Sequence, residues 1–148
     1  MAWLTAVAGF LIMILVGLST QNSHRTRALY DSAYAVDTAR NFGVLASKAA
    51  TLYAANPTYS GVLPQGALGL PTWYTPLPGL TAFANGGHLL VYQPQASAAI
   101  GGRVLKQLAA TGQIVGMCLN GTIYSPANVA LMAAPVGVPN YAVVQIVL

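Results

Sequence analysis

The feature that most constrains this chain is its opening, MAWLTAVAGFLIMILVGLSTQNSHRTR, in which the first charged side chain is Arg25. From Ala2 to Leu18 every residue is apolar or Gly except Thr5. A helix needs about 20 mainly apolar residues to cross the roughly 30 Å of hydrocarbon in a bilayer. The opening therefore predicts a transmembrane anchor in residues 1–22. The side chains expected to hold the bilayer are Trp3, Phe10, Leu11, Ile12, Met13, Ile14 and Leu15.

Two kinds of proteolytic processing compete with a permanent anchor. A secretory signal peptide has basic residues before its apolar run and a small-residue cleavage site after it, and this opening has neither. Gly9-Phe10 resembles the junction that prepilin peptidases cut, but Ile14 stands where the pilin pattern has Glu. A minor pilin or pseudopilin, incorporated in a filament after processing at Gly9, is therefore the alternative.

Charged side chains are scarce, with six Lys and Arg and two Asp and Glu in 148 residues. The apolar share is 55%, which favours a membrane-associated protein over a disordered one. The cations are too scattered to neutralise a phosphate backbone, so no nucleic-acid partner is expected. The single cysteine, Cys118, lies in an apolar stretch and is expected to be a small core residue.

A long helix is predicted after the anchor, because residues 27–55 contain no Pro and one Gly. Apolar residues recur along it at spacings of three and four, which indicates a face that packs on the rest of the chain. This apolar stripe consists of Ala35, Ala39, Phe42, Ala46, Ala49 and Tyr53. Asn56-Pro57 ends the helix, since the residue before proline is disfavoured in helical geometry. We therefore expect a stalk helix at 23–56.

The rest of the chain, residues 57–148, predicts a small α+β domain that packs with the stalk helix as one unit. Residues 56–87 are rich in Pro and Gly but also in apolar side chains, which indicates an ordered, irregular loop. Four elements are expected to follow: a strand at 88–93, a short helix at 97–112 capped by Ser97, a hairpin turning at Asn120-Gly121, and a final strand at 141–148. The sheet should be mainly antiparallel, with one further short helix besides the stalk.

Residues that could perform catalysis or hold a metal are few and poorly spaced. His24, His88 and Cys118 share no local metal-ligand spacing. Asp31 and Asp37 lie six residues apart and are expected on different sides of a helix, which does not suit an acid–base pair. No phosphate-binding glycine motif is present. The sequence therefore predicts no enzyme, no cofactor and no small-molecule substrate; a membrane-tethered envelope enzyme is the competing hypothesis.

Several segments stand in a distinctive order along the whole chain. A helix ending LYAANP is followed by GVLPQGALGLPTWYTPLPGL, by an HLLVY strand, by a short helix and by a Gly-containing hairpin. In this layout, and most clearly in ALGLPTWY at 67–74, the chain resembles the PilM family found in the type IVb (thin) pilus operons of conjugative plasmids.

The resemblance implies a noncatalytic, single-pass inner-membrane component of type IV pilus assembly that supports pilus-dependent conjugation. Its C-terminal domain would lie in the periplasm, and its partners would be other pilus-assembly proteins of the inner membrane. Arg25 and Arg27 argue against that orientation, because positive charges favour the cytoplasmic side.

Trp73 and Tyr74 form a candidate partner contact, since aromatic residues often anchor interfaces. The alternative is a Trp packed under its own loop.

Overall fold

The computed structural model describes the backbone of residues 2–147 and the side chains of residues 12–147. Its elements are α1 (Ala2–Ala55), β1 (Gly61–Val62), the 3-10 turn η1 (Gln65–Ala67), β2 (Thr81–Asn85), β3 (His88–Gln93), α2 (Ala98–Ala109), β4 (Ile114–Leu119), β5 (Thr122–Tyr124), β6 (Ala130–Ala133) and β7 (Val143–Ile146). The chain divides into two compact units, Met1–Tyr34 and Ala35–Leu148. The predicted limits of anchor, stalk and domain stay predictions.

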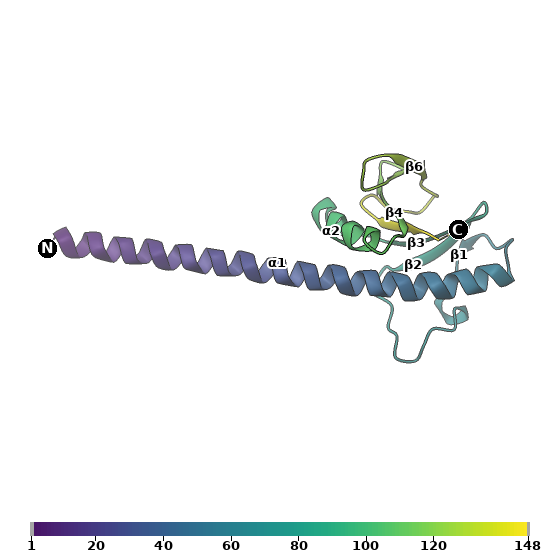
Figure 1. The fold of residues 1–148 in the computed structure, drawn as a ribbon, viewed down its shortest axis with the longest axis horizontal. Coiled ribbons are helices and arrows are strands. Elements are labelled where there is room, and N and C mark those ends of the chain that lie inside the picture. The colour runs from purple at the N-terminus through teal and green to yellow at the C-terminus, as the bar shows by residue number, and fades with distance from the viewer. Residues whose placement is uncertain (1, 148) are drawn as a thin grey trace. The chain divides into compact units, whose positions relative to one another are not determined.

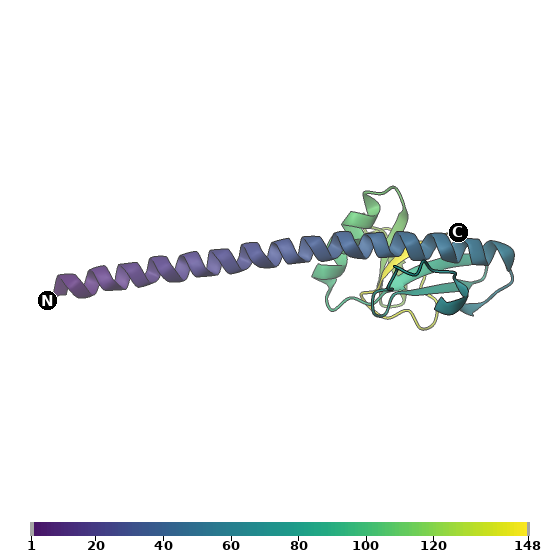
Figure 2. The same ribbon diagram turned by 90° about the horizontal axis from the view of Figure 1, so that it is seen from below.

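Helix α1 confirms the predicted long helix and its end before Pro57. The Asn56 backbone N–H donates to the Tyr53 carbonyl at 3.0 Å, which closes the last turn. From Ala35 onward α1 crosses one face of the sheet (Figures 1 and 2). The part of α1 before Ala35 belongs to the first unit.

The predicted bilayer span has no counterpart in the part of the chain that the structure describes. None of the helices there combines the length and the apolar character that a bilayer crossing requires. Among the predicted anchor residues, Ile12, Met13, Ile14 and Leu15 are exposed on α1. The apolar run in the described segment ends at Leu18, and polar residues follow it. The side chains of the other predicted anchor residues, Trp3, Phe10 and Leu11, lie outside the described residues.

Among the described residues of the second unit, seven strands form one antiparallel sheet in the order β1-β2-β3-β7-β4-β5-β6. The predicted final strand exists as β7, and it lies between β3 and β4 in the middle of the sheet. The predicted strand at 88–93 and the predicted hairpin are confirmed as β3 and as β4–β5. Asn120 and Gly121 have φ angles of 50° and 76°, as a type I′ turn requires.

The sequence-based prediction was wrong where three further strands occur. Strands β1 and β2 lie in the segment predicted as an irregular loop, and β6 lies in a segment without any predicted element. β1 has only two residues, while Ala occupies two of the five positions of β2 and two of the four positions of β6. Ala is no strand former, so pairing with neighbouring strands decides these elements rather than local preference.

The larger core lies where α1 and α2 pack on one face of the sheet. The whole predicted stripe takes part: Ala35, Phe42, Ala46, Ala49 and Tyr53 are buried, and Ala39 is half-buried. On the other face Leu90, Ile123 and Val144 form a second core, against which Met132 and Val138 pack. The connection between β6 and β7 therefore helps to cover the face that the helices leave open.

Helix α2 is slightly shorter than predicted but keeps the predicted cap. The Ser97 hydroxyl accepts a hydrogen bond from the Ile100 backbone N–H at 3.4 Å. Gly101 is buried, and a methyl group there would lie 3.2 Å from the Met117 side chain. A glycine that weakens the helix locally thus lets α2 approach β4 closely.

Candidate functional site

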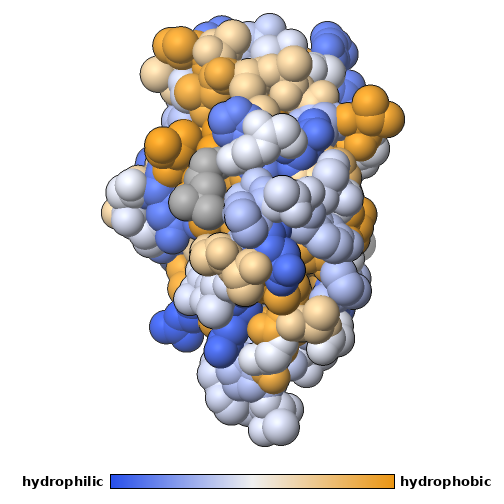
Figure 3. All heavy atoms as spheres, turned by 90° about the vertical axis from the view of Figure 1, so that its right-hand side faces the viewer, coloured by the Kyte–Doolittle hydropathy of each residue, from blue (hydrophilic) through white to orange (hydrophobic). Residues whose placement is uncertain are grey.

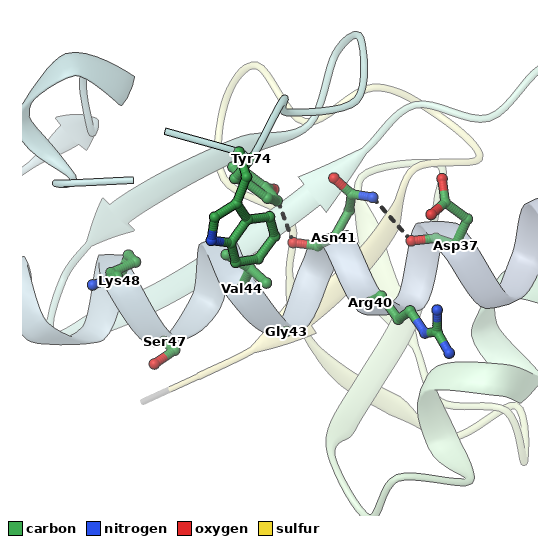
Figure 4. Close-up of a pocket in the computed structure, with 9 residues that line it drawn as sticks. Asp37, Arg40, Asn41, Gly43, Val44, Ser47, Lys48 and Tyr74 are labelled. Atoms are coloured by element: carbon green, nitrogen blue, oxygen red, sulfur yellow. Dashed lines mark hydrogen bonds between the residues drawn. The ribbon is translucent and has the colours of Figure 1, made fainter. Parts of the chain in front are cut away.

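A hollow of the second unit lies between α1 and the connection from η1 to β2. Its volume is about 730 Å³, and it is open to solvent. The lining residues, shown in Figure 4, are Asp37, Arg40, Asn41, Gly43, Val44, Ser47, Lys48, Trp73 and Tyr74. We call this hollow the α1–loop cleft. It contains both aromatic residues that the sequence singled out as a candidate partner contact.

Helical spacing explains how α1 builds one wall of the cleft. Asp37, Asn41, Val44 and Lys48 follow one another at intervals of four, three and four, so they share a face of the helix. Gly43 leaves a gap in this wall, because a methyl group at its Cα would meet nothing within 4 Å. The wall is therefore mainly apolar at its centre, with charged residues toward its ends.

Tyr74 fixes the opposite wall. Its hydroxyl donates a hydrogen bond to the Asn41 backbone carbonyl at 3.0 Å, drawn as a dashed line in Figure 4. Its backbone N–H donates to the Pro71 carbonyl at 2.9 Å, which closes a turn of the loop. Burial raises the pKa of the Tyr74 hydroxyl. Since tyrosine is protonated at neutral pH even without such a shift, the hydroxyl is a hydrogen-bond donor there.

Trp73 has a different environment from its neighbour. Its side chain is 75% exposed, so it is not packed under its own loop. Its ring meets the Tyr74 ring edge to face, with centroids 6.2 Å apart. A ring held beside an anchored tyrosine loses little freedom when a partner covers it. The role of the pair as a contact surface stays a prediction.

The cleft is also lined by polar and charged side chains. The Asn41 side-chain amide donates to the Asp37 carbonyl at 3.0 Å, while its oxygen, Oδ1, is buried and has no partner among the described residues. In Figure 4 the Asp37 carboxylate and the Arg40 guanidinium point away from each other. The lining carries one net positive charge, because it contains two cations, Arg40 and Lys48, and one carboxylate, Asp37. The cleft thus offers apolar surface and two cations, which suits the binding of a protein segment.

The other reactive residue types do not gather at this cleft. Within the part of the chain described by the structure, no three or more His, Cys, Asp or Glu side chains are grouped to hold a metal ion. Cys118 is 1% exposed in the second core. Burial raises its thiol pKa, against a smaller lowering by a hydrogen bond with the Gly121 backbone.

Sequence reasoning found the loop side of the cleft and missed the helix side. Asn41, Gly43, Val44 and Lys48 were not singled out. Their shared helix face, next to the buried stripe, was the signal that could have found them.

Comparison with family models identifies one family for this chain. The model of the PilM family matches residues 10–146. The crystal structure of a PilM protein from Escherichia coli B7A is similar over 77% of this chain and 91% of that one, with a TM-score of 0.58 and 15% identity, which supports the fold. A PilM protein from Pseudomonas aeruginosa 2192 is 28% identical over 75% of this chain and 92% of that one, with a TM-score of 0.44. None of the curated proteins matches the chain.

Proposed function

This chain belongs to the PilM family, and from that membership we propose that it is a noncatalytic component of type IV pilus assembly that supports conjugation. The family match across residues 10–146 is the observation that carries this proposal. The component works by binding other pilus-assembly proteins, with the α1–loop cleft as its docking site.

The geometry of the cleft supports the choice of docking site. Trp73 is exposed beside an apolar wall, and the Tyr74–Asn41 hydrogen bond holds its loop in place. Exposed aromatic side chains on a fixed backbone are typical of residues that dominate binding energy.

Gly43 provides a sharp test, because it lines the cleft and has open space at its Cα. Gly43→Phe should fill the cleft, whereas the matched control Gly43→Ala adds only a methyl group and favours the helix by about 0.5–1 kcal/mol. Each variant would replace the wild-type gene in the host strain, and surface pili, mating frequency and protein abundance would be measured.

A loss of roughly 1.4 kcal/mol in the free energy of partner binding weakens that binding about tenfold. We expect Gly43→Phe to lower pilus number and mating frequency by at least about this factor. Gly43→Ala should leave both unchanged. Normal pili and mating with Gly43→Phe at wild-type abundance would exclude the cleft as the docking site. Normal pili in a strain that lacks the gene would exclude the assembly function itself.

We further propose that residues 1–22 hold the chain once in the inner membrane with its C-terminal domain in the periplasm. The uncharged opening of the sequence supports the membrane span. The periplasmic orientation rests on the family resemblance alone, against the charges of Arg25 and Arg27. Resistance to alkaline extraction from membranes would agree with the membrane span. For the orientation, a reporter that works only in the cytoplasm would be fused after Leu148, and activity of this fusion would contradict a periplasmic C-terminal domain.

One specific observation, the Gly9-Phe10 junction, favours a minor pilin as the second candidate function. The N-terminal sequence of the protein from its host decides between the two. A chain that begins at Met1 or Ala2 agrees with a permanent anchor, while one that begins at Phe10 and is recovered in sheared filaments is a pilin.

A further inference from the structure

Charge is distributed unevenly over the second unit. Its one carboxylate side chain is that of Asp37, whereas its cations are Arg40, Lys48, Arg103 and Lys106. All of these charged side chains belong to α1 or α2, the helices that pack on one face of the sheet. The helix side of this unit therefore attracts an acidic partner and repels a basic one.

Two of these cations line the α1–loop cleft and have no counter-ion in the chain. Arg40 is exposed and Lys48 is half-buried, and neither makes an ion pair within the part of the chain that the structure describes. Val44 lies midway between them along α1, and Trp73 lines the same cleft. The cleft thus carries unpaired positive charge on either side of an apolar centre.

The spacing of the two cations indicates what they can hold. Arg40 and Lys48 are eight residues apart on a helix that rises 1.5 Å per residue, so their Cα atoms lie roughly 12 Å apart along its axis. An extended chain covers about this distance in four residues, and its side chains at i, i+2 and i+4 point to one side. Carboxylates at i and i+4 can therefore meet the cations, while an apolar side chain at i+2 meets Val44.

Other occupants fit the cleft less well. A second copy of the chain brings the carboxylate side chains of Asp31 and Asp37 only, and Asp37 lines the cleft itself. A flat anionic membrane surface does not fill a hollow of about 730 Å³. On the face of the molecule in Figure 3, hydrophobic residues lie in separate groups among hydrophilic ones. That face offers no continuous apolar surface to compete with the cleft.

We propose that the occupant of the α1–loop cleft is an extended acidic segment of a pilus-assembly protein, with one apolar side chain and a carboxylate on either side of it. The apolar side chain packs against Val44 and Trp73. The two carboxylates pair with Arg40 and Lys48. This inference rests on the proposed function, because it names the chemistry of the partner at the same cleft. Such charge complementarity acts mainly on the rate of encounter and on the choice of partner.

The test is photo-cross-linking in the host strain. The photoreactive amino acid p-benzoyl-phenylalanine replaces Ser47, an exposed and uncharged residue of the cleft wall. Mass spectrometry of the cross-linked product identifies the captured molecule and the segment that is joined. We expect an inner-membrane pilus-assembly protein, joined through a segment that has two carboxylates four residues apart.

Charge reversal measures whether the cations hold this segment. Arg40→Glu and Lys48→Glu are each compared with the matched control Lys106→Glu, which changes the net charge equally but lies on α2 outside the cleft. At equal protein abundance, each cleft variant should lower the cross-linking yield about fivefold and the control less than about twofold. Exchange of the facing carboxylate of the partner for lysine should restore the yield. If a pilus-assembly protein is captured equally well by the cleft variants and the control, the inference is wrong and the proposed function stands.

Salt provides a second measurement that needs no charge variant. Raising the ionic strength of isolated membranes from about 0.1 M to about 1 M shortens the Debye length from about 10 Å to about 3 Å. The cross-linking yield from Ser47 should therefore fall, and an unchanged yield would contradict charge pairing. Capture of phospholipid only would assign the cleft to the membrane surface instead. Capture of no pilus-assembly protein would overturn the proposed docking site together with this inference.

Discussion

The substitution Gly116→Ala should destabilise the chain, although Gly→Ala in a compatible backbone usually stabilises. Gly116 is buried in β4 opposite Val144 of β7. A methyl group there would lie 2.5 Å from Cγ2 of Ile123 and 2.7 Å from the Tyr124 carbonyl oxygen. Ordinary carbon contacts are about 3.5–4.0 Å, so both neighbours would have to move. Ile123 is fully buried in the second core, and the Tyr124 carbonyl is backbone.

The size of the effect follows from two opposing contributions. Overpacking a rigid site costs about 1–3 kcal/mol, and the lower entropy of the unfolded chain returns about 0.4–1 kcal/mol. From the middle of each range, about 2 and about 0.7 kcal/mol, the free energy of unfolding should fall by roughly 1.3 kcal/mol. At about 4 °C per kcal/mol for a unit of this size, Tm should fall by about 5 °C.

Differential scanning calorimetry of the full chain measures this change in the cooperative unfolding of the sheet. The matched control is Gly102→Ala on α2, where a methyl group meets nothing within 4 Å, and which should raise stability by about 0.5–1 kcal/mol. Opposite signs for the two substitutions are the expected result. If Gly116→Ala melts at or above the wild-type temperature, the close approach of β4 and β5 described here is wrong.

Two further predictions concern the cores. Phe42→Ala, which empties a fully buried position between α1 and the sheet, should lower the free energy of unfolding by about 3–5 kcal/mol in a denaturant titration; a loss below about 1 kcal/mol would mean that α1 is not packed as described. The raised pKa of Cys118 means that the native state keeps its proton at a pH where the unfolded state loses it, so stability should fall as pH rises above the ordinary thiol pKa of about 8.5. In Cys118→Ala the slope of stability against pH should be smaller above that pH, and an unchanged slope would rule out this contribution.

The elements predicted correctly are those whose signals are local. The long helix, its end before Pro57, the Ser97 cap and the Asn120-Gly121 turn each depend on hydrogen bonds between residues a few positions apart. The apolar stripe on α1 was also readable, because a 3.6-residue period is a property of the sequence itself. The family resemblance could also be recognised from the sequence, since it rests on the order of these segments along the chain.

Only the tertiary structure decided the features that depend on contacts between residues far apart in the sequence. β7, the last strand in the sequence, lies between β3 and β4, and Ala-rich β2 and β6 are strands because neighbours complete their hydrogen bonds. The α1–loop cleft exists because the Tyr74 hydroxyl reaches the Asn41 carbonyl across the chain. A sequence carries its helical period within each segment, but the partners of a strand or a loop are set only when the whole chain has packed.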